Sequence, residues 1–232
     1  MIKENRVSKY LLYAIGEIIL VVIGILIALQ LNNWNTEQKR TEQELGLLIE
    51  MRENLLNDLN DVEYNITTNK RLMTGSEMVM KHLTERTPFH DSLKVHYAQI
   101  FGNTKQSVNS SAFENLKSSG FDLIQNDSLR RNISILYTEQ LPVLEDQESG
   151  FDSSVQSQNL SNLIYGKVVM DTVWQSAYPL DPVALMDDEV FKGALRMNIF
   201  ARGFMLRRYE KLKIRIEGLI EQISTELEER QK

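Results

Sequence analysis

The segment YAIGEIILVVIGILIALQLNNW, residues 13–34, is a long apolar run with one carboxylate inside it. Over residues 11–31, Glu17 and Gln30 are the only strongly polar side chains. A helix rises about 1.5 Å per residue, so this run covers about 30 Å, the thickness of the hydrocarbon core of a bilayer. The segment therefore predicts one N-terminal transmembrane helix.

Aromatic residues stand at both ends of the run, with Tyr10 and Tyr13 before it and Trp34 after it. Aromatic side chains of this kind gather at the two membrane interfaces, so we assign the anchor to residues 10–34. A cleaved signal peptide is the alternative, because basic residues precede an apolar run. The run is longer than a typical signal core and no A-x-A-like cleavage site follows it, so we expect the anchor to be retained.

Cations before the run indicate the orientation of the anchor. They are Lys3, Arg6 and Lys9, whereas Lys39 and Arg40 after the run are interleaved with glutamates. The positive-inside rule then predicts a short cytoplasmic N-terminus over residues 1–9. The remaining helical domain, residues 35–232, is expected outside the cytoplasm, in the periplasm of a bacterial cell.

Small residues share one face of the predicted span with its carboxylate. At about 100° per residue, this face contains Ala14, Glu17, Val21, Gly24 and Ala28. Gly24 and Ala28 form a small-xxx-small pair, which allows two helix backbones to approach closely. We predict a helix-packing face, used in a homo-oligomer or with the span of a partner. The alternative is that the spacing of the small residues is fortuitous and that Glu17 reaches the interface or is protonated.

Two long amphipathic stripes flank the rest of the chain. The first alternates steps of three and four through Leu45, Leu48, Arg52, Leu55, Leu59, Val62 and Ile66. The second lies in a predicted last helix from about Pro182 to Glu229 and comprises Leu212, Ile216, Leu219, Ile223 and Leu227. Stripes with the same period at opposite ends of a chain most simply pack antiparallel. We predict an all-α fold: one transmembrane helix followed by an elongated antiparallel helical bundle with a coiled-coil-like stalk.

The middle of the chain predicts shorter elements. The first long helix is expected to reach about Asn69, with a break near Gly75 left open, and to end before Pro88. NTKQSVNSS, residues 103–111, indicates a loop, and SAFENLKSSG, residues 111–120, a short helix stopped by its glycine. Pro142 is expected to kink or end a helix, and residues 150–162, rich in Ser, Gln and Asn, to form a loop. No strand-type alternation of useful length is present.

Two stretches also resemble a known family. They are SKYLLYAIGEIILVVIGILIALQLNNWN (residues 8–35) and FENLKSSGFDLIQNDSLRRNISILY (residues 113–137). Together they resemble a widespread family of uncharacterised single-span membrane proteins of Bacteroidota. The resemblance implies a bacterial inner-membrane protein with a mostly helical domain after the anchor. It implies no catalytic residues, because the family brings none.

Composition and motifs exclude several function classes. The formal net charge is −6 and cysteine is absent, which argues against a broad nucleic-acid surface, disulfides and thiolate metal sites. No phosphate-binding glycine loop, nucleophile elbow or H-E-x-x-H motif occurs. We therefore expect no catalytic residues, no metal site and no cofactor. Residues 187–189, DDE, are expected to complement a helix dipole. The basic run over residues 201–215 is expected to pair with glutamates; the alternative is that it contacts anionic lipid headgroups.

These observations predict a membrane-anchored interaction or structural module rather than an enzyme. Its expected partners are the lipid bilayer and either a second copy of the chain or another membrane protein. The alternative is a ligand-sensing domain, with Tyr165, Trp174, Tyr178 and Phe191 as candidates to line a pocket. With only about ten residues before the span, such a sensor would need a partner protein to carry its signal.

Overall fold

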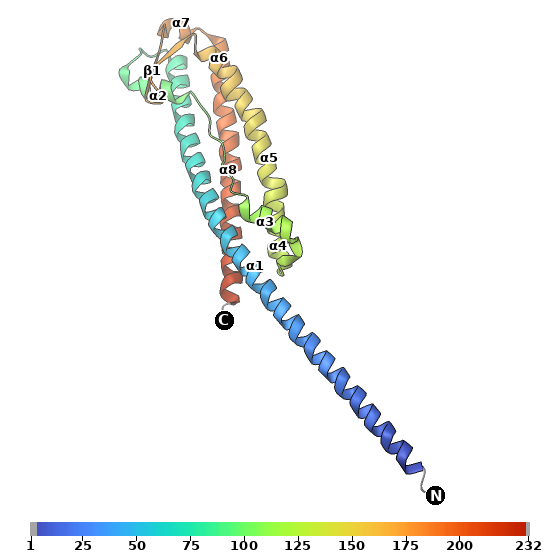
Figure 1. The fold of residues 1–232 in the computed structure, drawn as a ribbon. Helices are drawn as coiled ribbons and strands as arrows, with labels where there is room; N and C mark the ends of the chain where they lie inside the picture. The colour runs from blue at the N-terminus through green and yellow to red at the C-terminus, as the bar shows by residue number, and fades with distance from the viewer. Residues whose placement is uncertain (1–3, 231–232) are drawn as a thin grey trace. The chain divides into compact units, whose positions relative to one another are not determined.

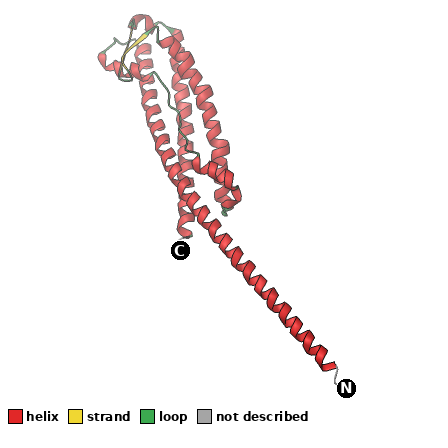
Figure 2. Cartoon of the chain, viewed as in Figure 1, coloured by secondary structure: helices red, strands yellow, loops and turns green. Residues whose placement is uncertain are grey.

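The computed structural model describes residues 4–230, with side chains for residues 9–158 and 160–230. Helices make up most of this part of the chain, and its strands are the two of one hairpin (Figure 2). The all-α class predicted from the sequence is therefore confirmed. The chain divides into two compact units, Met1–Leu47 and Leu48–Lys232, and each is described by itself.

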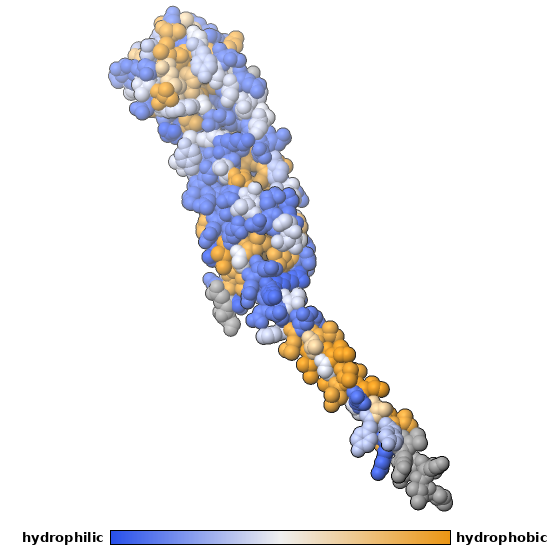
Figure 3. All heavy atoms as spheres, in the orientation of Figure 1, coloured by the Kyte–Doolittle hydropathy of each residue, from blue (hydrophilic) through white to orange (hydrophobic). Residues whose placement is uncertain are grey.

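The first unit consists of the N-terminal part of helix α1, whose bounds are Glu4–Glu85. The helical backbone continues through Asn32, Asn33 and Asn35, although asparagine is a poor helix former. The apolar part of α1 is long and apolar enough to cross a membrane, by its length and composition. None of its most apolar 18-residue window is buried, and Figure 3 shows a hydrophobic surface along the face of this segment that is in view.

The second unit is built on the rest of α1 and on helix α8, Glu189–Glu229. Polar contacts join these helices in reverse chain order: Glu63 with Lys213, Lys70 with Glu210, and Ser76 with Asn198. Arg86, just after α1, pairs with Asp187, just before α8, and continues the series. The two helices are therefore antiparallel (Figure 1). The predicted α8 stripe is buried throughout, and Leu48, Leu55 and Val62 on α1 are fully buried. The antiparallel packing of the two stripes is confirmed.

Helix α1 runs through Gly75 without a break, so the break left open at this position is absent. The glycine has a packing reason. A Cβ at Gly75 would lie 2.4 Å from the side chain of Gln99, so only a residue without a side chain lets helix α2 come this close. After Glu85 the chain leaves the helix at Arg86, which has a positive φ of 54°, and Pro88 follows.

A small cap closes one end of the second unit (Figure 1). It is formed by the 3-10 turn η1 (Asp91–Leu93), α2 (Lys94–Gln99), strands β1 (Val168–Thr172) and β2 (Ser176–Pro179), and α7 (Pro182–Met186). The strands pair antiparallel, with Val168 opposite Pro179 and Met170 opposite Ala177. The sequence did not predict this hairpin, because strands of five and four residues are too short to show a clear alternation.

One further long helical stretch, residues 127–164, packs along α8. Its parts, in order, are α4 (Asp127–Ile135), η3 (Leu136–Gln140), α5 (Leu141–Asp146), η4 (Gln147–Asp152), η5 (Ser154–Leu160) and α6 (Ser161–Ile164). The parts η3, η4 and η5 are π-helical. Pro142 does not end the helix: it lies in the first turn of α5, directly after π-helical η3, where its missing N–H is tolerated.

The loop predicted over residues 150–162 is wrong, because these residues are helical. Val155 and Leu160 are buried, as are the polar residues Asp152 and Gln156. Gln156 donates to Asp152 Oδ1 over 3.2 Å, and its Oε1 accepts from Asn198 Nδ2 of α8. The polar composition that indicated a loop therefore belongs partly to a buried, hydrogen-bonded face of a helix.

The last predicted helix is divided into α7 and α8. Asp181 caps α7 by accepting from Ala184 N, as its position before Pro182 predicts. Asp188 then accepts from Phe191 N over 2.9 Å and caps α8. Each aspartate stabilises a new helix start, so the chain turns between the two helices instead of continuing.

The predicted loop after Gly102 is confirmed. Residues 102–110 have no regular secondary structure and run along the bundle from the cap towards α3, Ser111–Ser119, which precedes the 3-10 turn η2, Phe121–Leu123 (Figure 1). The predicted short helix is α3, and it ends at Gly120 with a φ of +97°. We call residues 102–110 the strap.

Candidate functional site

All residues singled out in the apolar segment lie in α1 and are exposed. They are Tyr10, Tyr13, Ala14, Glu17, Val21, Gly24, Ala28 and Trp34. Five of them follow helical spacings of three or four residues, so α1 places them on one side of the helix. A Cβ at Gly24 would meet nothing within 4 Å among the described residues. The predicted packing face is thus an open surface of this chain, and its use in packing stays a prediction.

A second candidate site lies in the second unit, where the strap crosses two buried carboxylates and one half-buried carboxylate. Three of its backbone N–H groups donate to carboxylates: Asn109 to Asp58 Oδ1 (2.8 Å), Ser107 to Asp61 Oδ2 (2.7 Å) and Gln106 to Glu148 Oε1 (2.8 Å). The strap has neither helix nor sheet partners, so its amides need other acceptors. Carboxylates from α1 and from η4 provide them.

The α1 acceptors belong to a polar stripe that sequence reasoning missed. It comprises Asn54, Asp58, Asp61, Asn65 and Asn69, at spacings of three or four residues. Asn69 donates to Thr104 Oγ1 over 2.6 Å, and Asn65 to Gln106 Oε1 over 3.2 Å. The prediction for this helix named only its apolar stripe. The helical spacing of the polar residues was the available signal for a second, polar contact line.

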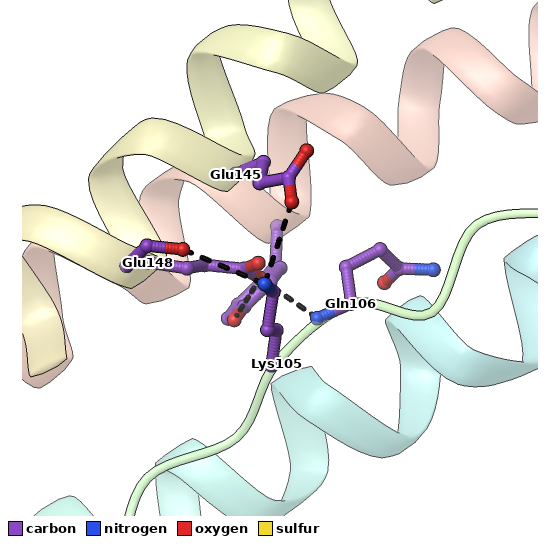
Figure 4. Close-up of polar contacts among 6 residues, drawn as sticks. Lys105, Gln106, Glu145 and Glu148 are labelled. Atoms are coloured by element: carbon purple, nitrogen blue, oxygen red, sulfur yellow. Dashed lines mark hydrogen bonds and ion pairs between the residues drawn. The ribbon is translucent and has the colours of Figure 1, made fainter.

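Glu148 lies at the centre of the strap's contacts with the helical stretch 127–164 (Figure 4). Its side chain is buried, and Oε1 also accepts from the Tyr209 hydroxyl over 2.7 Å. Burial raises the pKa of Glu148, against the lowering effect of the hydrogen bonds from Tyr209 and Gln106. Lys105 reaches outwards beside it, with Nζ 3.5 Å from Glu145 Oε1 and 3.4 Å from Ser149 Oγ.

Arg202 on α8 holds the start of the strap from inside the bundle. Its side chain is fully buried, Nη2 donates to Gly102 O over 2.7 Å, and Nε donates to Asn198 Oδ1 over 3.2 Å. Burial lowers the pKa of Arg202 to about 10, and the charge of Asp152 opposes this shift. Nη1 has no hydrogen-bond partner among the described residues.

Asp58 is the most perturbed of the carboxylates under the strap. It is 3% exposed, and its Oδ2 has no hydrogen-bond partner among the described residues. Burial raises the pKa of Asp58 to about 6; the N–H of Asn109 opposes this shift and the charge of Asp61 adds to it. A carboxylate of this kind is ionised or neutral depending on small changes around neutral pH.

A cleft of about 610 Å³ opens between the strap, α3 and the helical stretch 127–164. Phe113 and Tyr137 form one wall and stack at 4.5 Å with an interplanar angle of 8°. The Tyr137 hydroxyl is buried without a partner among the described residues, and burial raises its pKa. The volume is in the range of small-molecule sites.

The residues proposed for a sensing pocket do not gather around one cavity. Phe191 is fully buried in the core of the cap, whereas Tyr165 and Trp174 are exposed and Tyr178 is half-buried. In the basic run, Lys213 pairs with Glu63 at 2.5 Å and Arg215 Nε donates to Gln140 Oε1. No group of three or more metal-ligating His, Cys, Asp or Glu side chains occurs within the described residues.

The sequence model of a family of unknown function, DUF6090, matches residues 17–145. The matched part begins at Glu17 in α1 and includes the strap, α3 and α4, so it covers the exposed span face except Ala14 and the lining of the cleft except Glu148. Among curated proteins nothing matches the chain. Among solved structures nothing matches it either.

Proposed function

The chain belongs to DUF6090, a family of unknown function whose model covers residues 17–145 of its 232, and from this premise we propose that it is a single-pass membrane-anchored helical interaction module. It associates with a second copy or with another membrane protein through its span and stalk. The observation that supports this proposal is the exposed face of α1 that combines Glu17 with Gly24 and Ala28. Lipid tails are as apolar as leucine, so helices associate in a bilayer where small residues permit close backbone contact.

Glu17 strengthens this assignment. A carboxylate inside a hydrocarbon layer is costly, and such residues normally face another helix and not lipid. The bulky residues Ile15, Ile19 and Leu26 lie away from the small-residue face and suit contact with lipid. One face of the helix is therefore suited to a protein partner and the other to the bilayer.

Crosslinking in native membranes tests this association. Gly24→Leu adds a bulky side chain to the proposed face, whereas Gly16→Leu, the matched control, adds the same side chain to a different face. A Cβ at either glycine meets nothing within 4 Å in this chain, so neither change disturbs a contact within the chain. We expect Gly24→Leu to abolish or reduce the crosslinked species and Gly16→Leu to retain it. Equal crosslinking of both variants would show that the proposed face does not mediate the association.

We place the domain that follows the span in the periplasm and the anchor in a bacterial inner membrane. The cations before the span and the resemblance to single-span proteins of Bacteroidota support this location. Two of these cations, Lys3 and Arg6, lie outside the residues whose side chains the structure describes. Lys9, the third, is exposed.

The absence of native cysteine makes this topology directly measurable. Lys9→Cys and Lys39→Cys put single, exposed thiols on either side of the span. A membrane-impermeant maleimide applied to spheroplasts is expected to label Lys39→Cys and to label Lys9→Cys only after lysis. The reverse pattern would invert the proposed topology.

A ligand-sensing role that acts through a partner is the second candidate function. The cleft of about 610 Å³ beside the strap favours it, because a volume of this size is in the range of small-molecule sites. Ligand-dependent thermal stabilisation of the full chain tests this role.

A further inference from the structure

The cleft has an apolar wall suited to a ring. Phe113 and Tyr137 stack against each other, and Leu141 and Pro142 extend the same surface. Aromatic side chains bind flat ligands by offset stacking or edge contacts. Phe113 is 5% exposed and Tyr137 7%, so a ligand ring reaches only part of their surface and rests mainly on the more exposed Val108 and Pro142.

Charged side chains line the cleft as two exposed pairs of opposite sign, together with the buried Glu148, which already accepts from Gln106 N and from the Tyr209 hydroxyl. On α3, Lys117 Nζ lies 3.0 Å from Glu114 Oε2. Across the cleft, Lys105 Nζ lies 3.5 Å from Glu145 Oε1, and Figure 4 shows how these two side chains approach from the strap and from α5. All four side chains are about half exposed, so both pairs are weak and open to exchange with a ligand.

This charge pattern selects among ligand classes. A ligand with only a carboxylate can take a lysine but leaves a glutamate without its cation. A ligand with only an ammonium leaves a lysine without its carboxylate. A zwitterion engages one lysine and one glutamate and leaves no charge unpaired, which avoids the cost of desolvating lone charges.

We propose that the cleft between the strap, α3 and α5 binds a zwitterion that carries an apolar ring, which is the chemistry of a free aromatic amino acid or a short peptide containing one. The ring lies against this apolar wall. The carboxylate faces Lys105 or Lys117, and the ammonium faces Glu145 or Glu114. This inference rests on the second candidate function and is independent of association through the span.

Calorimetric titration of the full chain in detergent micelles tests the proposal with two probes, L-phenylalanine and glycyl-L-phenylalanine. Each probe has two matched analogues: the N-acetyl form, which keeps only the carboxylate, and the C-terminal amide, which keeps only the ammonium. At least one of the two zwitterions is expected to bind about three- to tenfold more tightly than both of its analogues, because each lost charge removes a charge-assisted contact at a half-exposed site. Absence of binding by both zwitterions, or equal binding by their analogues, would overturn the proposal.

Substitutions locate the site. Lys105→Met combined with Glu145→Gln should weaken binding, whereas Lys70→Met combined with Glu210→Gln, a similarly exposed pair between α1 and α8, should not. Equal effects of the two double variants would assign binding to another part of the chain.

The Gly24→Leu chain separates this inference from the proposed association. Its span face is altered, but the cleft is unchanged, so it is expected to bind the same probe with the same affinity. Loss of crosslinking together with retained binding supports both claims. Retained crosslinking in this variant would count against the span face, and absence of probe binding would count against the cleft.

Discussion

Asp58 shows how a buried carboxylate couples the strap to pH. Burial raises the pKa of Asp58 to about 6, against about 3.9 in an unfolded chain, so the folded state binds this proton more tightly. The contribution of Asp58 to stability is therefore fully present below about pH 4 and is lost as the pH rises through 6. At neutral pH the buried Asp58 is ionised, and the folded state would be more stable with a neutral group at this position.

Asp58→Asn is expected to stabilise the protein at pH 7.5 by about 1–3 kcal/mol, because the amide keeps an acceptor for Asn109 N and carries no charge. The gain should be mostly lost near pH 4, where Asp58 is neutral in the folded state and about half ionised in the unfolded chain. Urea unfolding of the full chain at both pH values measures the difference. Asp171→Asn, at an exposed position, serves as the control. A variant less stable than the parent chain at pH 7.5 contradicts this account.

Removal of Arg202 is expected to destabilise the protein, because its buried guanidinium donates to two oxygen acceptors and lies near the charge of Asp152. Arg202→Met removes the donors to Gly102 O and Asn198 Oδ1 and leaves the buried Asp152 without a nearby cation. We expect a loss of about 3–5 kcal/mol in the free energy of unfolding. Adding Asp152→Asn should recover part of this loss, since the uncompensated charge is then gone. Additive losses in the double variant would show that the two residues do not interact.

At the scale of elements, the strap is held by side chains in place of a ladder of backbone hydrogen bonds. The N–H groups of Gln106, Ser107 and Asn109 each donate to a carboxylate. Hydrogen exchange is therefore expected to be slow at these three amides, although they lie outside any helix or strand.

The double change Asp58→Ala and Asp61→Ala should accelerate exchange at residues 107 and 109 while helix α8 stays protected. Mass spectrometry of exchanged peptides that cover residues 102–110 measures this. Fast exchange of the strap in the parent chain would show that these hydrogen bonds do not persist.

The elements that could be predicted from the sequence are those in which apolar residues recur at one dominant helical spacing. The α8 stripe from Leu212 to Leu227 is buried as predicted, because every contact side chain in it is apolar. The helix over residues 150–162 was not predictable in this way. Its buried face includes Asp152, which accepts from Gln156, and Gln156, which accepts from Asn198 on α8. Hydropathy scores such residues as solvent-exposed.

The candidate cleft was equally hidden from sequence. Phe113 and Tyr137 are 24 residues apart, and the glutamates and lysines around them resemble ordinary solvated charges. Only the course of the strap brings them together. By contrast, the span face could be predicted, because all of its residues lie on a single helix and helical geometry alone defines it.

At the scale of the whole molecule, the division at Leu47 and Leu48 separates the exposed apolar helix from the unit that contains the strap and the cleft. The buried core residues lie almost entirely from Leu48 onwards. A chain that lacks residues 1–47 is therefore expected to remain folded, with helical circular dichroism and a single cooperative thermal transition. If it unfolds, the first unit supplies stability that its exposed side chains do not reveal.

This shortened chain also assigns the association to a part of the molecule. If the face of Glu17, Gly24 and Ala28 provides the main contact, the shortened chain should be monomeric by light scattering at micromolar concentration, while the full chain in mild detergent is oligomeric or partner-bound. A dimeric shortened chain would place the main contact in the stalk, where the apolar residues Leu56, Tyr64 and Ile214 are exposed. The span would then act chiefly as an anchor, and Gly24→Leu would leave the oligomer intact, so the two experiments check each other.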